Sequence, residues 1–185
     1  NLYHLSMPTK VKRLGDFKNH EGFIYLKEDH KPFHFISSAN SPILYNQDIS
    51  IGSFSFDSKL GNNNKDNFFQ RNGDSDLLLY IQGGSGTLKT NYGNLDIHEG
   101  DYVVVPRGVI YQIYIVENLY GLEVYSKSPI ETPSKYRNRL GQLLEHSPYC
   151  ERDIRTPELQ KPINEKGEFH VLVKFREGTK SLIYE

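Results

Sequence analysis

Residues capable of nucleophilic or metal chemistry gather in one stretch toward the carboxy-terminal end of the sequence. They are Glu145, His146, Cys150, Glu151 and Asp153. A thiol beside an imidazole can be activated as a nucleophile, and the same side chains can hold a metal ion. The segment is also strongly charged and contains a proline, which favours a structural role. We therefore expect a loop held closed by charge-assisted hydrogen bonds of Arg152, Asp153 and Arg155.

A second candidate set is defined by its spacing to a turn rich in glycine and proline. Gly100, Pro106 and Gly108 lie at the spacing of the second cupin motif, and Tyr111 stands where that motif has a histidine metal ligand. Such a ligand must direct a lone pair inward from its strand. A neutral phenol is a poor ligand for iron or zinc, so the pattern predicts a cupin-like turn without its metal ligand.

The first cupin motif, counted back from Gly84, falls on three further residues. Gln70 and Asn72 take the positions of its two histidines, and Leu77 takes the position of its glutamate. Leucine cannot ligate a metal, and neutral amides bind iron and zinc poorly. The sequence therefore predicts no catalytic, cofactor-binding or metal-ligating residue here. Gln70, Asn72 and Tyr111 instead become the polar groups that a small molecule in the barrel interior would contact.

The elements that would position these residues follow a rhythm of short strands and glycine turns. Residues 77–81 form a continuous apolar run that predicts a strand buried on both faces, and residues 95–98 and 102–105 have strand patterns. The glycines of 83–86 are expected to end the first strand in a barrel turn. With the motif spacing, this rhythm predicts an all-β, cupin-like double-stranded β-helix, or jelly-roll barrel.

Further strands, a loop and a helix are predicted on both sides of this run. Strands are expected over 23–26, 33–36, 43–45, 49–56, 109–116, 119–125, 168–175 and 181–184. Asn118 is expected to be the turn between two of them. The segment 57–76 is rich in turn formers and is predicted to be a loop. Residues 135–145 are predicted to contain one short helix, because four apolar residues there fall on one helical face.

A chain of 185 residues usually forms one domain. The predicted elements divide that domain into four parts. Residues 1–20 form an amino-terminal arm, residues 21–128 the barrel with extra amino-terminal strands, residues 129–166 a loop-rich connection, and residues 167–185 a hairpin. The arm is either a solvated tail or a segment anchored on a neighbouring sheet or subunit. Because the sequence stops within a predicted strand, we expect a further half to follow the hairpin.

Composition and charge argue against several classes of function. Acidic and basic residues nearly cancel, at a net charge of −1, so no broad basic field exists to attract nucleic acid. No apolar run approaches the roughly 18 residues of a membrane span. Cys150 is the single cysteine and cannot form an internal disulfide, which is typical of a reducing compartment. We therefore predict a cytoplasmic protein with no nucleic-acid or membrane partner.

Five segments have sequences distinctive enough to compare with known families: 70–76, 101–108, 128–133, 135–155 and 167–169. The most specific part is Gln142-Leu-Leu-Glu-His-Ser-Pro-Tyr-Cys-Glu-Arg-Asp-Ile-Arg155, within 135–155. Together they closely resemble the amino-terminal half of bacterial homogentisate 1,2-dioxygenases, and the resemblance extends over nearly the whole chain.

The resemblance implies an enzyme with two cupin-like halves that cleaves the ring of homogentisate with non-haem Fe(II) and O2. The product is maleylacetoacetate, in the catabolism of tyrosine and phenylalanine. The iron ligands of the family lie in the carboxy-terminal half, so Fe(II) is expected for the full-length enzyme and not within this stretch. The stretch itself would be structural, covering the catalytic barrel and joining subunits into a homo-oligomer, a trimer or hexamer.

Two other functions stay open at this point. The chain could be a free-standing, metal-free cupin that binds a small molecule between Gln70, Asn72 and Tyr111. It could also be a metal-independent isomerase or epimerase, which would need an inward histidine with a carboxylate partner for proton transfer. No such pair is evident in the sequence, so this third function ranks last.

Overall fold

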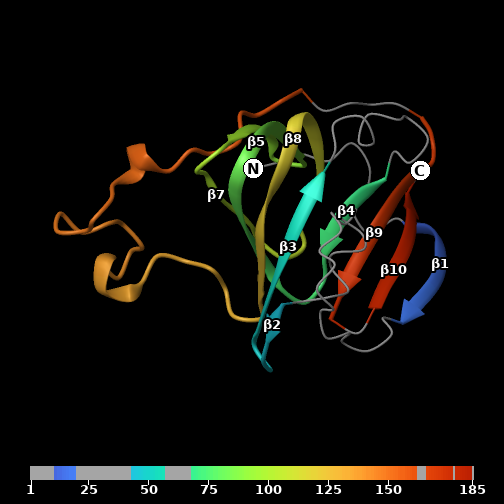
Figure 1. The fold of residues 1–185 in the computed structure, drawn as a ribbon, viewed down its shortest axis with the longest axis horizontal. Helices are drawn as coiled ribbons and strands as arrows, with labels where there is room; N and C mark the ends of the chain where they lie inside the picture. The colour runs from blue at the N-terminus through green and yellow to red at the C-terminus, as the bar shows by residue number, and fades with distance from the viewer. Residues whose placement is uncertain (1–10, 20–42, 57–67, 162–165, 177, 185) are drawn as a thin grey trace.

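The computed structural model describes residues 11–19, 43–56, 68–161, 166–176 and 178–184. Within them the chain is all-β, as predicted, and its strands join into one ten-stranded sheet that curls into a barrel (Figure 1). The strands are β1 (Val11–Asn19), β2 (Leu44–Tyr45), β3 (Ile49–Phe56), β4 (Phe69–Asn72), β5 (Asp76–Thr90), β6 (Gly93–His98), β7 (Tyr102–Val105), β8 (Ile110–Ser126), β9 (Phe169–Phe175) and β10 (Gly178–Tyr184). The order along the sheet is β1-β10-β9-β4-β8-β3-β2, and β5 pairs with β6, β7 and β8.

Two long strands, β5 and β8, form the centre of the barrel and pair antiparallel along most of their length. The glycines of 83–86 were predicted to end a strand, and Asn118 was predicted to be a turn. Both predictions were wrong, because bulges bend the two strands here without ending them. At Gly84 the backbone φ is +89°, and a β-carbon would collide with the carbonyl oxygen of Asn118. Glycine therefore lets the two strands approach closely at the bend.

The inward faces of β3, β5, β6, β7 and β8 are mainly apolar and pack into the main core, while β9 and β10 contribute a second, smaller cluster of Val171, Val173 and Leu182. The alternation predicted for 49–56 is confirmed, because every second residue from Gly52 to Phe56 is buried. The run 77–81 was predicted to be buried on both faces, but only its odd-numbered residues are fully buried. The core consists of Phe54, Phe56, Leu77, Leu79, Ile81, Leu88, Ile97, Val103, Val105, Val109, Tyr111, Ile115, Leu119 and Tyr125.

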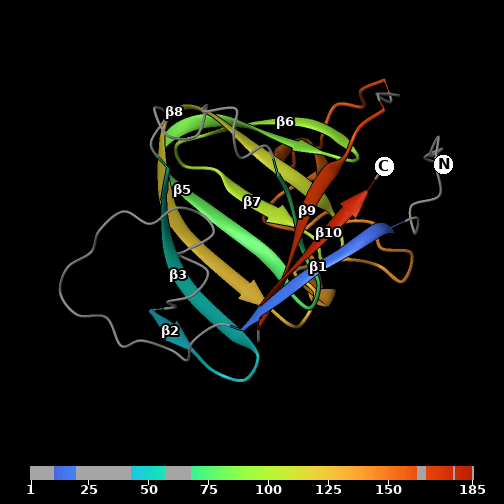
Figure 2. The same cartoon turned by 90° about the vertical axis from the view of Figure 1, so that its right-hand side faces the viewer.

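β4 lies inside the segment 57–76 that was predicted to be a loop, so that prediction was wrong for residues 69–72. β4 pairs parallel with β9 and antiparallel with β8, which places it within the sheet. Its partner β9 lies about a hundred residues further along the chain, so local composition carried no sign of the pairing. β9 and β10 form an antiparallel hairpin, and β1 adds to the outer edge of β10 (Figure 2).

The connection between β8 and β9 has no α-helix among its described residues. It contains two 3-10 turns, Ser134–Tyr136 and Glu151–Asp153, so the helix predicted within 135–145 is wrong. The side-chain oxygen of Asn138 accepts hydrogen bonds from the N–H groups of Leu140 and Gln142, and Gly141 has a φ of +86°. This side-chain-capped turn replaces the helical hydrogen bonds.

The connection projects from the barrel in Figure 1 and is attached to it at both ends. At its start, the Asp76 carboxylate accepts a hydrogen bond of 2.9 Å from the N–H of Ile130. Toward its end, the Arg155 guanidinium forms an ion pair with Asp101 and donates to the carbonyl oxygen of Asp96. The predicted strands 23–26 and 33–36 lie outside the described residues. No helix within the described ranges is long and apolar enough to cross a membrane.

Candidate functional site

The structure brings the three predicted interior residues together between β4 and β8. Gln70 lies directly opposite Tyr111 across the two strands, and the Tyr111 hydroxyl donates to Gln70 Oε1 at 3.3 Å. Asn72 follows two residues along β4, so its side chain lies on the same face of the strand as that of Gln70. Asn72 and Tyr111 are each only 2% exposed. That these residues contact a ligand stays a prediction.

A buried carboxylate, which the sequence analysis missed, completes this polar cluster. Glu123 lies on β8, is 1% exposed, and accepts a hydrogen bond of 3.0 Å from the Tyr125 hydroxyl at Oε2. The signal was present in the sequence. Glu123 shares the inward parity of Leu119 and Tyr125, and a charged residue on a core face indicates a special environment.

Both buried tyrosines are held in their protonated form. Burial raises the pKa of Tyr111, and the charge of Glu123 raises it further, whereas the Asn72 side chain opposes this shift. Burial and the same carboxylate raise the pKa of Tyr125 in the same way. Among the described residues, Asn72 Nδ2 makes no hydrogen bond of ordinary geometry, although the Tyr111 hydroxyl is close enough for the Asn72 side chain to influence it. The interior therefore contains phenol donors, one carboxylate and one amide N–H group that a ligand could engage.

The residues at this corner do not fit an iron centre. Leu77 is completely buried in the core, on the strand segment that pairs with Tyr125. A protonated phenol and neutral amides are weak donors, and a two-histidine, one-carboxylate iron site needs imidazole nitrogens that this corner does not supply. Within the described ranges, no group of three histidine, cysteine or acidic side chains is placed to hold a metal ion.

A lysine on β9 connects this interior cluster to the surface. The ammonium of Lys174 lies over the ring of Tyr125, 3.2 Å from its centroid. Asn72 and Lys174 are neighbours across the parallel pairing of β4 and β9. Because that pairing joins segments far apart in the sequence, no local pattern could have associated Lys174 with the barrel residues.

The cluster of residues 145–153 does not form a catalytic pair in the described part of the chain. Of the three residues expected to clamp the loop, Asp153 bonds within it, because its carboxylate accepts a hydrogen bond of 2.8 Å from the N–H of Cys150 and closes a 3-10 turn. His146 contacts the edge of the Tyr136 ring instead of the thiol. Arg155 reaches the barrel and not its own loop, so it anchors the connection to Asp101.

The long bulged strands and curled sheet define an all-β cupin fold. Within that class, the chain belongs to the family described as homogentisate 1,2-dioxygenase N-terminal, whose model matches residues 28–177. The predicted resemblance is thereby confirmed, and the chain is a dioxygenase-related cupin. Its own substrate is a separate question.

One curated relative and two solved structures illustrate what this chain is similar to. A Saccharolobus solfataricus protein named "Putative dioxygenase" is 31% identical over 96% of this chain and 47% of its own length. The chain thus spans about half the length of the curated relative it matches. Among solved structures, it is similar to a cupin-2 domain protein of Shewanella frigidimarina, at 12% identity and a TM-score of 0.38 over 55% of this chain and 84% of the other. A cupin protein of Bacteroides fragilis gives 13% identity and a TM-score of 0.40 over 64% and 93%.

Proposed function

We propose that this chain is the non-metal, amino-terminal half of a homogentisate 1,2-dioxygenase, with the iron chemistry carried by residues outside these 185. The observation that carries the proposal is the family match over 28–177, joined to a motif corner that cannot hold iron. In the proposed reaction a ring carbon–carbon bond of homogentisate breaks and both atoms of O2 enter the product, maleylacetoacetate. Leu77, Gln70, Asn72 and Tyr111 take no part in that step.

The outer side of the barrel supports a structural role for this half. A row of apolar side chains crosses β7, β5, β8, β3 and β2 on the face opposite the core. With one further apolar position, Leu122, and a stacked tyrosine pair beside it, we call this surface the outer apolar face: Leu44, Ile51, Leu78, Tyr80, Tyr102, Val104, Leu122 and Val124. Exposed apolar surface of this extent usually marks a protein interface. We propose that it packs against another subunit in a cytoplasmic homo-oligomer.

The division of labour can be tested by measuring iron and O2 uptake on two polypeptides. The 185-residue chain, purified after loading with ferrous iron, should retain no stoichiometric iron and should not consume O2 with homogentisate. A polypeptide that continues to the length of the dioxygenase relative should do both. The analogue 2-hydroxyphenylacetate, which lacks the second ring hydroxyl, serves as the substrate control. Stoichiometric iron on the 185-residue chain would overturn the proposal.

A second candidate, a metal-free cupin that binds a small molecule, is favoured by one observation. Asn72 Nδ2 is buried and makes no hydrogen bond of ordinary geometry among the described residues. Leaving such a group unpaired costs about 1–3 kcal/mol, and a bound ligand would remove that cost. Failure of the extended polypeptide to consume O2 with homogentisate would favour this binding function over the dioxygenase.

A further inference from the structure

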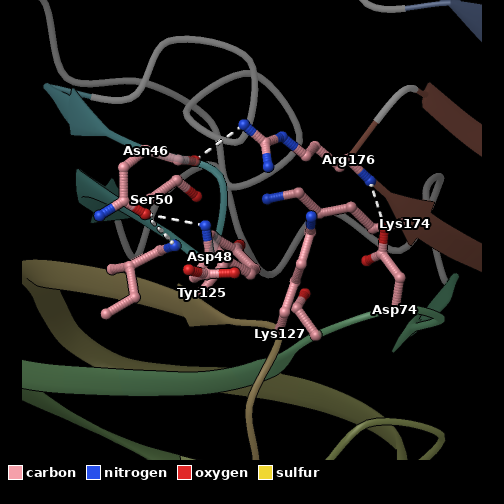
Figure 3. Close-up of a pocket in the computed structure, with 10 residues that line it drawn as sticks. Asn46, Asp48, Ser50, Asp74, Tyr125, Lys127, Lys174 and Arg176 are labelled. Carbon is pink, nitrogen blue, oxygen red and sulfur yellow. Dashed lines mark hydrogen bonds between the residues drawn. The ribbon is translucent and has the colours of Figure 1, made fainter.

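A pocket of about 60 Å³ opens beside the buried polar cluster, outside the barrel interior. Residues from the β2–β3 turn, the start of β5, the end of β8 and the end of β9 line it (Figure 3). Its floor is Tyr125, whose hydroxyl points away to Glu123 in the core. The pocket is therefore separate from the motif corner, although the ring of Tyr125 forms a wall common to both.

Three cationic side chains reach into this pocket from different elements. They are Lys127 after β8, Lys174 on β9 and Arg176 in the following turn (Figure 3). The Arg176 guanidinium is fixed in place, because NH1 donates to the carbonyl oxygen of Gln47 at 2.5 Å and NH2 to that of Asn46 at 2.8 Å. These bonds orient the guanidinium, and among the described residues its side chain forms no ion pair with a carboxylate.

No ion pair within the described residues neutralises these three cations. Asp74 lines the pocket, but its carboxylate accepts from the backbone N–H of Arg176 at 2.8 Å. Asp48 stands at the exposed rim, where it carries the pocket's other negative charge. The lining therefore holds three positive and two negative side chains, and the buried Glu123 adds a further negative charge that acts on Lys174 from the core side of Tyr125. On the pocket side the cations outnumber the carboxylates by one, which would attract an anion.

We propose that this pocket is a binding site for one small oxyanion, a phosphate, sulfate or carboxylate group, held by Lys127, Lys174 and Arg176. A planar guanidinium suits such an oxyanion because it can donate two parallel hydrogen bonds, and ammonium groups add charge at its other oxygens. The pocket has room for one anionic group. The rest of a larger ligand would have to lie outside the pocket, beyond its open mouth. The site does not depend on the proposed dioxygenase role.

Proton uptake at Lys174 would accompany anion binding. Burial lowers the pKa of Lys174 to about 8, although Glu123 and Asp74 oppose this shift. The charged and titratable groups around the ammonium are Asp48, Asp74, Glu123, Tyr125, Lys127 and Arg176. Because an oxyanion binds the ammonium and not the neutral amine, affinity should be constant well below this pKa. It should fall about tenfold per pH unit above it.

Calorimetric titration of the whole chain with sodium sulfate, at fixed ionic strength, tests the site. Sulfate keeps its charge over the pH range used, so any pH dependence belongs to the protein. We expect one sulfate to bind per chain, and binding to be at least about tenfold weaker in Lys174→Met. Lys174→Arg should bind sulfate almost normally and should not lose affinity at high pH, because arginine stays charged. Lys89→Met is the matched control, because Lys89 also lies over a tyrosine ring but far from the pocket.

Sodium acetate in a parallel titration separates the two sources of the anion. Tighter sulfate binding assigns a tetrahedral oxyanion, and tighter acetate binding assigns a carboxylate. If Lys174→Met does not fold, the same titration is made on Lys127→Gln, which changes an exposed lysine of the pocket. We expect this variant to bind sulfate about threefold more weakly than the wild type. Absence of binding by either anion, or equal weakening in Lys89→Met, would overturn the proposal.

Discussion

Asp76, at the start of β5, is a buried carboxylate that fixes two distant segments at once. It accepts hydrogen bonds of 3.0 Å from both the backbone N–H and the Nε of Arg107, and one of 2.9 Å from the N–H of Ile130. Burial raises the pKa of Asp76, but these hydrogen bonds lower it by more, so it lies below the ordinary value of 3.8. The ionised carboxylate therefore stabilises the folded chain.

Replacing this carboxylate should produce a stability loss that depends on pH. A group whose pKa is lowered by folding stabilises the fold above its unfolded pKa, and the stabilisation is lost as pH falls through the folded pKa. Asp76→Asn should reduce the free energy of unfolding by about 1–3 kcal/mol near neutral pH. The deficit should shrink below pH 3.8, where the wild-type carboxyl also takes up its proton.

Urea denaturation at neutral pH and below the ordinary carboxyl pKa measures both effects. Asp96→Asn is the control, because Asp96 is exposed and accepts a single side-chain hydrogen bond from Thr87. It should cost well under about 1 kcal/mol. A deficit in Asp76→Asn that stays constant on acidification would contradict the assignment of an ionised carboxylate.

For single residues, motif spacing in the sequence identified Gln70, Asn72 and Tyr111 but not the charged residues around them, Glu123 and Lys174. Gln70, Asn72 and Tyr111 lie close together because the glycine turns fix their distance from known motif positions, and their contact with a ligand stays a prediction. Glu123 has an inward parity that the sequence shows, but it coincides with no motif position, so the motif spacing did not identify it. Lys174 could not have been found, since only the parallel pairing of β4 and β9 brings it to Tyr125.

At the scale of elements, two glycines with nearly equal backbone angles make different demands. Gly84 has a φ of +89° and faces the Asn118 carbonyl oxygen across the bulge, whereas Gly100 has a φ of +88° and open space around it. A side chain would therefore strain the backbone at both positions, but it would collide with a neighbouring strand only at Gly84.

Alanine at each glycine should separate these two costs. Gly100→Ala should lower the free energy of unfolding by about 1 kcal/mol, the price of a left-handed backbone without glycine. Gly84→Ala should lower it by at least about 3 kcal/mol, because the strands must also move apart. Chemical denaturation of both variants is the measurement. Equal losses would show that close strand approach is not what requires glycine at Gly84.

Strands and turns could be predicted where the sequence pattern was local. The predictions were wrong where pairing with a distant segment determined the structure. The alternation of 49–56 is a local signal and was confirmed. The glycines of 83–86 and Asn118 look like turns in isolation, yet each lies opposite the other, and that pairing carries both strands through the bend. The helix predicted within 135–145 does not form, because the Asn138 side chain accepts the backbone hydrogen bonds of a turn there.

At the scale of the whole molecule, the outer apolar face should control association. Val104 is 41% exposed at one end of the apolar row, and Leu122 is equally exposed near its middle. A lysine at either position would place an unpaired charge in the proposed interface. Val104→Lys and Leu122→Lys should therefore shift the assembly toward the monomer, as measured by sedimentation velocity.

Val116→Lys is the matched control for this experiment. Val116 is 59% exposed on β8 but does not belong to the outer apolar face. Its replacement should leave the sedimentation coefficient unchanged. A wild-type chain that sediments as a monomer at all concentrations, or equal dissociation in all three variants, would show that this face does not join subunits.

The parallel pairing of β4 with β9 also sets an order of events during biosynthesis. Residues 69–72 leave the ribosome early, but their partner strand emerges only after residues 169–175 have been translated. Long-range pairings of this kind form slowly because a large loop must close first. A nascent chain stalled before residue 169 would therefore hold β4 without its parallel partner, and Asn72, which the finished protein buries, would be open to solvent on that side.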